Sequence, residues 1–147
     1  MHFLTVLIAL VSPAAAQPSC WLAIEDLRRA FPELVSQQET FSWRGNAVTF
    51  ECDGHAITRA SVSKSATGSM VDVRSAAASV GARITRDTTT AVRSALDRCM
   101  SQATREAGAA QTTSARAAID CRIDADSVTL SVATRQAESI DQNQPKS

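Results

Sequence analysis

The chain has 147 residues, and its 15 basic and 15 acidic side chains give a formal net charge of zero. The middle of the chain, residues 54–106, is mildly basic, but its positive charges are spread singly, and aromatic residues make up only 4% of the chain. These features argue against a nucleic-acid partner, because a DNA- or RNA-binding surface needs clustered cations and aromatic side chains for base stacking.

Residues 1–16 are predicted to form a cleavable secretory signal peptide. An apolar run over residues 3–11 is followed by a Ser-Pro pair and three alanines, whose small side chains fit the subsites of a signal peptidase. The segment departs from the usual pattern in one respect, because His2 and the amino terminus stand in place of a Lys or Arg. No segment reaches the roughly 20 apolar residues of a membrane-spanning helix, so we expect no membrane span after cleavage. The signal peptide predicts a periplasmic or extracellular location.

Residues 17–134 are predicted to form a single small domain, followed by a disordered polar tail over residues 135–147. The domain begins with a helix from Cys20, whose apolar residues at three- and four-residue spacing extend to Leu34. Pro32 is expected to end or bend this helix, because proline has no N–H to donate and clashes with the preceding turn.

The spacing of apolar residues changes to two after this helix. Alternation over residues 41–43 and 48–52, with a Gly-containing turn after each, predicts a β-meander whose third strand covers residues 55–63. A fourth strand over Ser69–Arg74 competes with a helical interpretation of the alanine-rich residues that follow.

The clearest element is a second helix, capped by Asp87 or Thr88 and ended by Gly108, with its apolar residues on one stripe. Alternation over residues 119–132 then predicts a second hairpin. The predicted fold class is α+β, with two main helices packed on an antiparallel sheet of about five to six strands and stapled by disulfides. Each helix precedes a meander or hairpin with a cysteine, which hints at a degenerate internal duplication.

Four cysteines are expected to form two disulfides, since an even number in a small exported domain is typical of a disulfide framework. Of the three pairings, we favour Cys20 with Cys52 and Cys99 with Cys121, because each would tie a predicted helix to the strand that follows it. An alternative makes Cys20 the lipid-anchored first residue of a lipoprotein. The residues before it lack the aliphatic side chain that such a site needs, and lipidation would leave an odd number of cysteines.

His55 is the only histidine after the signal peptide, and Asp53 and Glu51 lie close to it in sequence. These three residues are weak candidates for a general base and its orienting carboxylate, because no Gly-x-Ser-x-Gly nucleophile motif accompanies them. A surface histidine in a turn is the simpler interpretation.

Cys52 and His55 have a spacing that occurs in metal sites, but structural disulfides are favoured and no metal site is predicted.

Asp120, Asp124 and Asp126 surround the last predicted turn. Their spacing does not match an EF-hand loop, so we interpret them as turn residues and not as calcium ligands. No phosphate-binding loop or dinucleotide motif occurs in the sequence, and no cofactor is expected.

Basic side chains of the second helix provide a candidate interaction face. Arg98 and Arg105 would present a basic ridge to an acidic partner, although a solvated helix face is the default interpretation. Arg93 and Asp97 have the spacing of a surface ion pair.

The best interpretation is an exported, non-enzymatic protein that binds an unknown protein or small ligand through its sheet or its basic helix face. This hypothesis rests mainly on the missing catalytic motifs. One alternative is an inhibitor of a secreted enzyme, because disulfide-rigid loops lower the ordering cost of binding. Another is a small hydrolase that uses His55 with Glu51 and Asp53.

Overall fold

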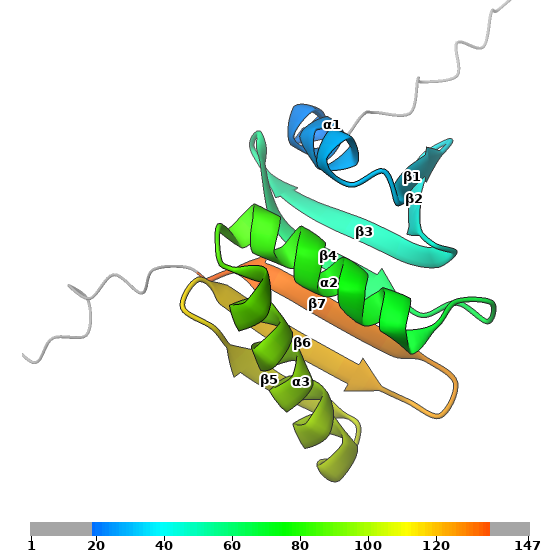
Figure 1. Cartoon of the computed structure of the whole chain (residues 1–147), viewed down its shortest axis with the longest axis vertical. Helices are drawn as coiled ribbons and strands as arrows, with labels where there is room; N and C mark the ends of the chain where they lie inside the picture. Colours follow the sequence, from blue (N-terminus) through cyan, green and yellow to red (C-terminus); the bar gives the residue numbers. More distant parts are fainter. Residues whose placement is uncertain (1–18, 136–147) are drawn as a thin grey trace, which may run out of the picture.

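The structure, a computed structural model, describes residues 19–135. The predicted signal peptide and residues 136–147 of the predicted tail lie outside this range. Within it, three helices form a layer over one face of a seven-stranded antiparallel sheet (Figure 1). None of these helices is long and apolar enough to cross a membrane.

The elements follow one another as a helix, four strands, two helices and three strands. Their bounds are α1 (Trp21–Ala30), β1 (Leu34–Gln37), β2 (Thr40–Trp43), β3 (Asn46–Asp53), β4 (Ala56–Ser63), α2 (Met70–Thr85), α3 (Thr89–Arg105), β5 (Ala109–Thr113), β6 (Ala117–Ile123) and β7 (Val128–Thr134). The order across the sheet is β1-β2-β3-β4-β7-β6-β5. The antiparallel pairing of β4 with β7 therefore joins an N-terminal meander to a C-terminal one.

The predicted α+β class is confirmed, with three helices instead of two main ones and seven strands instead of five to six. The predicted third strand and second hairpin correspond to β4 and to β6 with β7. The sequence pattern does not indicate β5, because Ala109–Thr113 contains only small or polar side chains and shows no alternation of large apolar residues.

The expected end of the first helix near Ala30, before Pro32, is confirmed, because α1 ends at Ala30. Leu34, which the helical spacing of apolar residues included, is instead the first, buried residue of β1. The fourth strand over Ser69–Arg74 does not form. Ser69 caps α2 instead, with its hydroxyl accepting the backbone N–H of Asp72 at 3.2 Å, so the alanine-rich segment is helical from its first turn.

The core is thin because small residues line the contact between helices and sheet. α2 packs over β4 and β7, and α3 packs over β5 and β6. At Gly81 of α2, an added Cβ would come within 2.7 Å of Cγ1 of Val132 in β7. Only glycine permits this approach of the helix to the central strand, and the buried alanines of α2 extend the close contact along the helix.

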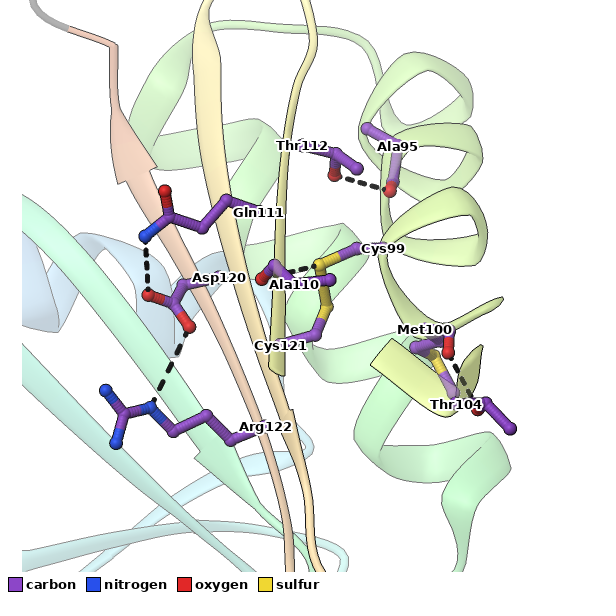
Figure 2. The surroundings of a disulfide bond; sticks show 10 residues. All are labelled: Ala95, Cys99, Met100, Thr104, Ala110, Gln111, Thr112, Asp120, Cys121 and Arg122. Atoms are coloured by element: carbon purple, nitrogen blue, oxygen red, sulfur yellow. Dashed lines mark hydrogen bonds and ion pairs between the residues drawn. A yellow bond between two sulfur atoms is a disulfide. The ribbon is translucent and has the colours of Figure 1, made fainter. Parts of the chain in front are cut away.

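Both favoured disulfides are confirmed. Cys20, the residue that precedes α1, is joined to Cys52 near the end of β3, with 5.6 Å between their Cα atoms. Cys99 in α3 is joined to Cys121 in β6, with 5.9 Å between Cα atoms, and both side chains are fully buried (Figure 2). Each disulfide thus ties a helix to the sheet beneath it.

Candidate functional site

All three helices pack on the same side of the sheet, so the opposite face has no helix over it within residues 19–135 (Figure 1). We call this surface the open face. Its side chains alternate along each strand with those of the core; in β7, Thr129 and Ser131 of the open face alternate with buried Leu130 and Val132. The open face is polar, as expected for an antiparallel sheet with one face in water.

The strand register aligns the open-face side chains of β3, β4, β7, β6 and β5 in three rows. The first row holds Glu51, Arg59, Ala133, Ala118 and Thr113; the second holds Thr49, Ser61, Ser131, Asp120 and Gln111; the third holds Ala47, Ser63, Thr129, Arg122 and Ala109. Most of these side chains are Ala, Ser or Thr, and none is aromatic. The rows therefore form a flat surface with few protruding groups.

Hydroxyl groups pair across the centre of the open face. The Oγ atoms of Ser61 and Ser131 lie 2.7 Å apart, and Oγ of Ser63 lies 3.0 Å from Oγ1 of Thr129. Such cross-strand pairs hold the side chains in fixed rotamers. The middle of the open face is therefore an ordered polar surface before any partner binds.

A shallow cavity of about 290 Å³ opens on the open face toward β5. Its polar lining groups are Arg59, Gln111, Thr113 and Asp120, and Ala118 contributes a methyl group among them. The lining offers a guanidinium, a carboxylate, an amide and a hydroxyl within one small area. It can exchange hydrogen bonds with a polar ligand but provides little apolar area to bury.

A bulge in the β3–β4 pairing lies directly before Arg59. The pairing of β3 with β4 shifts by one residue between Glu51–Arg59 and Cys52–Ile57. In an undistorted strand, residues 57 and 59 would share a face. Because of the shift, Ile57 is buried in the core whereas Arg59 lies on the open face, with its Nε 3.4 Å from Oε2 of Glu51.

Asp120 is the acidic centre of the same surface. Its carboxylate accepts a hydrogen bond from Nε2 of Gln111 at 3.4 Å and lies 4.0 Å from Nε of Arg122. Figure 2 shows these three side chains on the side of the strands opposite the Cys99–Cys121 disulfide. The carboxylate is thus partly balanced by its neighbours and remains half-buried on the surface.

The weak catalytic candidates do not form a hydrogen-bonded group in the described structure. His55 lies exposed in the β3–β4 turn, with Nδ1 3.3 Å from the backbone oxygen of Ser19. Glu51 is paired with Arg59 on the open face, and Asp53 is an exposed residue at the end of β3. The geometry places the imidazole beside the start of α1 instead of beside a carboxylate.

The predicted basic ridge lies on the exposed side of α3. Arg98 is exposed but its NH2 group donates to the backbone oxygen of Thr113 at 3.2 Å, so it helps to hold edge strand β5 against α3. Arg105 is exposed in the last turn of the helix. The expected pair of Arg93 with Asp97 is wrong, because NH1 of Arg74 in α2 binds Asp97 at 3.1 Å.

Of the three aspartates around the last turn, only Asp124 is engaged in the turn itself: its backbone N–H donates to the oxygen of Ser127 at 2.8 Å. Asp120 lies on the strand before the turn, and Asp126 is exposed within it. Residues 19–135 contain no group of three or more His, Cys, Asp or Glu side chains placed to hold a metal ion.

Asp87 connects the start of α3 to the β5–β6 turn. Its Oδ2 accepts hydrogen bonds from the hydroxyl of Ser114 at 2.5 Å and from the backbone N–H of Arg116 at 3.0 Å, both in the β5–β6 turn. Its Oδ1 accepts the N–H of Thr88 at 2.8 Å, where α3 begins. These bonds, that from Ser114 above all, lower the pKa of Asp87 below its ordinary value of 3.8. Asp87 therefore acts as a structural clamp.

Sequence reasoning missed Arg59, Gln111 and Thr113 as members of one surface. Arg59 has a local signal, since it precedes two serines at alternate positions of β4. Gln111 and Thr113 lie on the strand that the pattern does not indicate, and β5 is connected to β4 in the sheet only through β6 and β7.

Comparison of the chain with models of protein families, with curated proteins and with solved structures found no match.

Proposed function

We propose that this protein is an exported, non-enzymatic binding module whose open face contacts a protein partner with a polar surface. The observation that carries the proposal is the open face itself, an ordered layer of mostly short polar side chains next to a cluster of charges. Short side chains let a partner's backbone approach closely, and the paired hydroxyl groups lose little rotamer freedom when it binds.

The dimensions favour a macromolecule over an enclosed small ligand. The six spacings between seven strands make the open face roughly 29 Å wide at about 4.8 Å each. The cavity upon it, about 290 Å³, is small and shallow by comparison. A surface of this width matches a protein interface better than a pocket that surrounds a ligand.

The chemistry of the open face favours a protein among macromolecules. Nucleic acids and sugars are commonly held by aromatic stacking, and the aromatic residues of β2 and β3 lie on the core side instead. The charged groups include both signs, Arg59 and Arg122 with Glu51 and Asp120. A partner surface of mixed polarity complements this pattern better than a uniformly charged polymer.

The disulfides support the exported location. Two disulfides use all four cysteines, and structural disulfides persist in oxidising compartments such as the periplasm or the extracellular space. The predicted signal peptide at residues 1–16 supports the same conclusion from the sequence.

A substitution on the open face tests the proposal. The protein retained by the wild-type chain in the exported fraction of producing cells is first identified by non-denaturing mass spectrometry. Ala118→Arg then places a long charged side chain on the floor of the open face. We expect this variant to lose about tenfold or more of the affinity for that partner, since a bulky charge prevents close approach.

Ser101→Arg is the matched control, because Ser101 is exposed on α3 on the other side of the sheet. It should keep the affinity of the wild type. Retention of the partner by Ala118→Arg would overturn the proposal, and so would a wild-type chain that retains no protein. A retained secreted enzyme whose activity falls on binding would identify the module as an inhibitor.

A further inference from the structure

A second hollow lies on the helix side of the molecule, lined by residues of α1, of the start of β4 and of the C-terminal end of α2. Two adjoining cavities of about 290 Å³ and 510 Å³ meet there, and both are lined by Arg83 and Arg86. We call this hollow the arginine groove. It shares no residue with the open face and does not depend on the function proposed for it.

The inner wall of the arginine groove is apolar. It is formed by Ala23, Leu27, Ala56, Ile57 and Ile84, which come from α1, from β4 and from the last turn of α2. Leu27 and Ile57 belong to the buried core, so the wall is held in place by the packing of the domain. The accessible part of the wall comes from Ala23, Ala56 and Ile84, and a short hydrocarbon chain that contacts it releases water from it.

The two arginines at the mouth of the groove are available to bind an anion. None of the ion pairs and side-chain hydrogen bonds among residues 19–135 involves Arg83 or Arg86. A guanidinium without a protein partner binds a carboxylate through two parallel hydrogen bonds when one is supplied.

Two carboxylates also line the groove, and both already have partners. Asp26 lies 3.6 Å from NH1 of Arg29. Asp87 is occupied by the donors of Ser114, Thr88 and the backbone of Arg116. Neither acid forms an ion pair with Arg83 or Arg86, so both positive groups remain for a ligand.

The backbone at Arg86 provides an independent observation. Arg86 follows the last turn of α2 in the left-handed conformation, with a φ of 58°, at the position where helices usually place glycine. A side chain in this conformation is strained, and glycine would remove the strain. The chain instead carries a long cationic side chain there, directed to the mouth of both cavities.

We propose that the arginine groove binds a small amphiphilic anion, with its acidic head group between Arg83 and Arg86 and its short hydrocarbon chain against the apolar wall. A carboxylate head satisfies both the charge and the hydrogen-bonding geometry of the guanidinium groups. The cavity that the apolar wall lines, about 290 Å³, is close to the lower end of the usual volume range of small-ligand sites, so the hydrocarbon chain that it accepts is short.

The test titrates the protein with octanoate, and with 1-octanol as the uncharged control, by calorimetry and by backbone-amide NMR. Octanoate should bind saturably and shift amide signals of the last turn of α2 and of the β3–β4 hairpin, while octanol should bind far more weakly. Absence of octanoate binding, or equal binding of octanol, would overturn the proposal. Binding to vesicles of an anionic phospholipid but not to octanoate would assign the arginines to a membrane surface, and would also contradict it.

Arg86→Gly separates a ligand role from a structural one. The variant should raise the melting temperature, because glycine relieves the left-handed strain, yet weaken octanoate binding about tenfold or more through the lost charge-assisted hydrogen bonds. Arg44→Gly is the matched control: Arg44 has a φ of 46° in the β2–β3 turn, outside the groove, so its replacement should stabilise the fold without changing octanoate binding. Arg83→Gln provides a second variant, and unchanged affinity in both Arg83→Gln and Arg86→Gly would refute the site.

Discussion

The two halves of the sheet are built alike but stabilised differently. On either side of the central β4–β7 contact lie two matching three-stranded meanders, β2-β3-β4 and β5-β6-β7, and β1 is an additional edge strand of the N-terminal half. In each half a preceding helix is joined by a disulfide to the middle strand, α1 to β3 and α3 to β6. This arrangement agrees in topology with the repetition expected from the order of elements in the sequence.

The helices α1 and α3 differ in how many of their residues are buried. α3 has 17 residues, of which five are buried, and its disulfide leaves from the middle of the helix. α1 has 10 residues, of which only Ile24 and Leu27 are buried, and its disulfide leaves from the residue before the helix. The same covalent link therefore reinforces a packed helix in one half and tethers a loosely packed one in the other.

The largest effect is expected from Cys99→Ala/Cys121→Ala. The loops closed by the two disulfides, with separations of 22 and 32 residues, give chain-entropy estimates of roughly 3 to 4 kcal/mol for both. Loop length alone therefore does not distinguish them; the difference lies in Cys52, which is partly exposed whereas the other three cysteines are buried. Because Cys99 and Cys121 are fully buried, this double variant should lose about 4 to 5 kcal/mol of unfolding free energy in urea titrations.

A smaller effect is expected from Cys20→Ala/Cys52→Ala. Without its tether, α1 should detach while the sheet stays folded, so the unfolding free energy should fall by only about 1 to 3 kcal/mol. Hydrogen exchange should show loss of protection confined to α1 and the adjoining β1. A double variant in this half that loses more stability than the one in the other half would break the comparison.

The smallest effect is expected at Asp87, which connects the start of α3 to the β5–β6 turn. Asp87→Asn should lose about 1 kcal/mol near neutral pH, because the charge-assisted hydrogen bonds to the β5–β6 turn are weakened.

The pH dependence of that difference sharpens the prediction. Since the pKa of Asp87 in the folded protein lies below its ordinary 3.8, its stabilising contribution is fully present above that value and is lost as the pH falls through the folded pKa. Thermal melts of the wild type and Asp87→Asn should therefore converge in acid. A difference that stays constant over the whole range would show that the charge of Asp87 contributes nothing.

Local patterns in the sequence predict much of this fold. Alternation of apolar residues in β2–β4 and β6–β7, the cap at Thr88 and the proline after α1 are local signals, and each predicts its element. The order of helices and strands favours the observed disulfide pairing, but the sequence leaves three pairings open, and the structure decides between them. β5 lacks such a signal, since it is an edge strand of small and polar residues with little to bury.

The open face could not be predicted, because it depends on contacts between distant parts of the chain. Arg59 and Asp120 belong to one surface only through the pairing of β4 with β7 and of β7 with β6. The register shift beside Cys52 further separates Arg59 from Ile57, which is two residues earlier but is buried in the core. Neither the strand order nor a bulge leaves a mark in the spacing of apolar residues.

The most direct test of the account is the mass of the protein recovered, without reductant, from the exported fraction of cells that produce it. The account predicts a chain that begins at Gln17 with two hydrogens fewer for each of its two disulfides, together with a non-covalently retained protein under non-denaturing conditions. A full-length chain, or one with all four thiols reduced, would contradict the account of an exported, disulfide-stapled binding module.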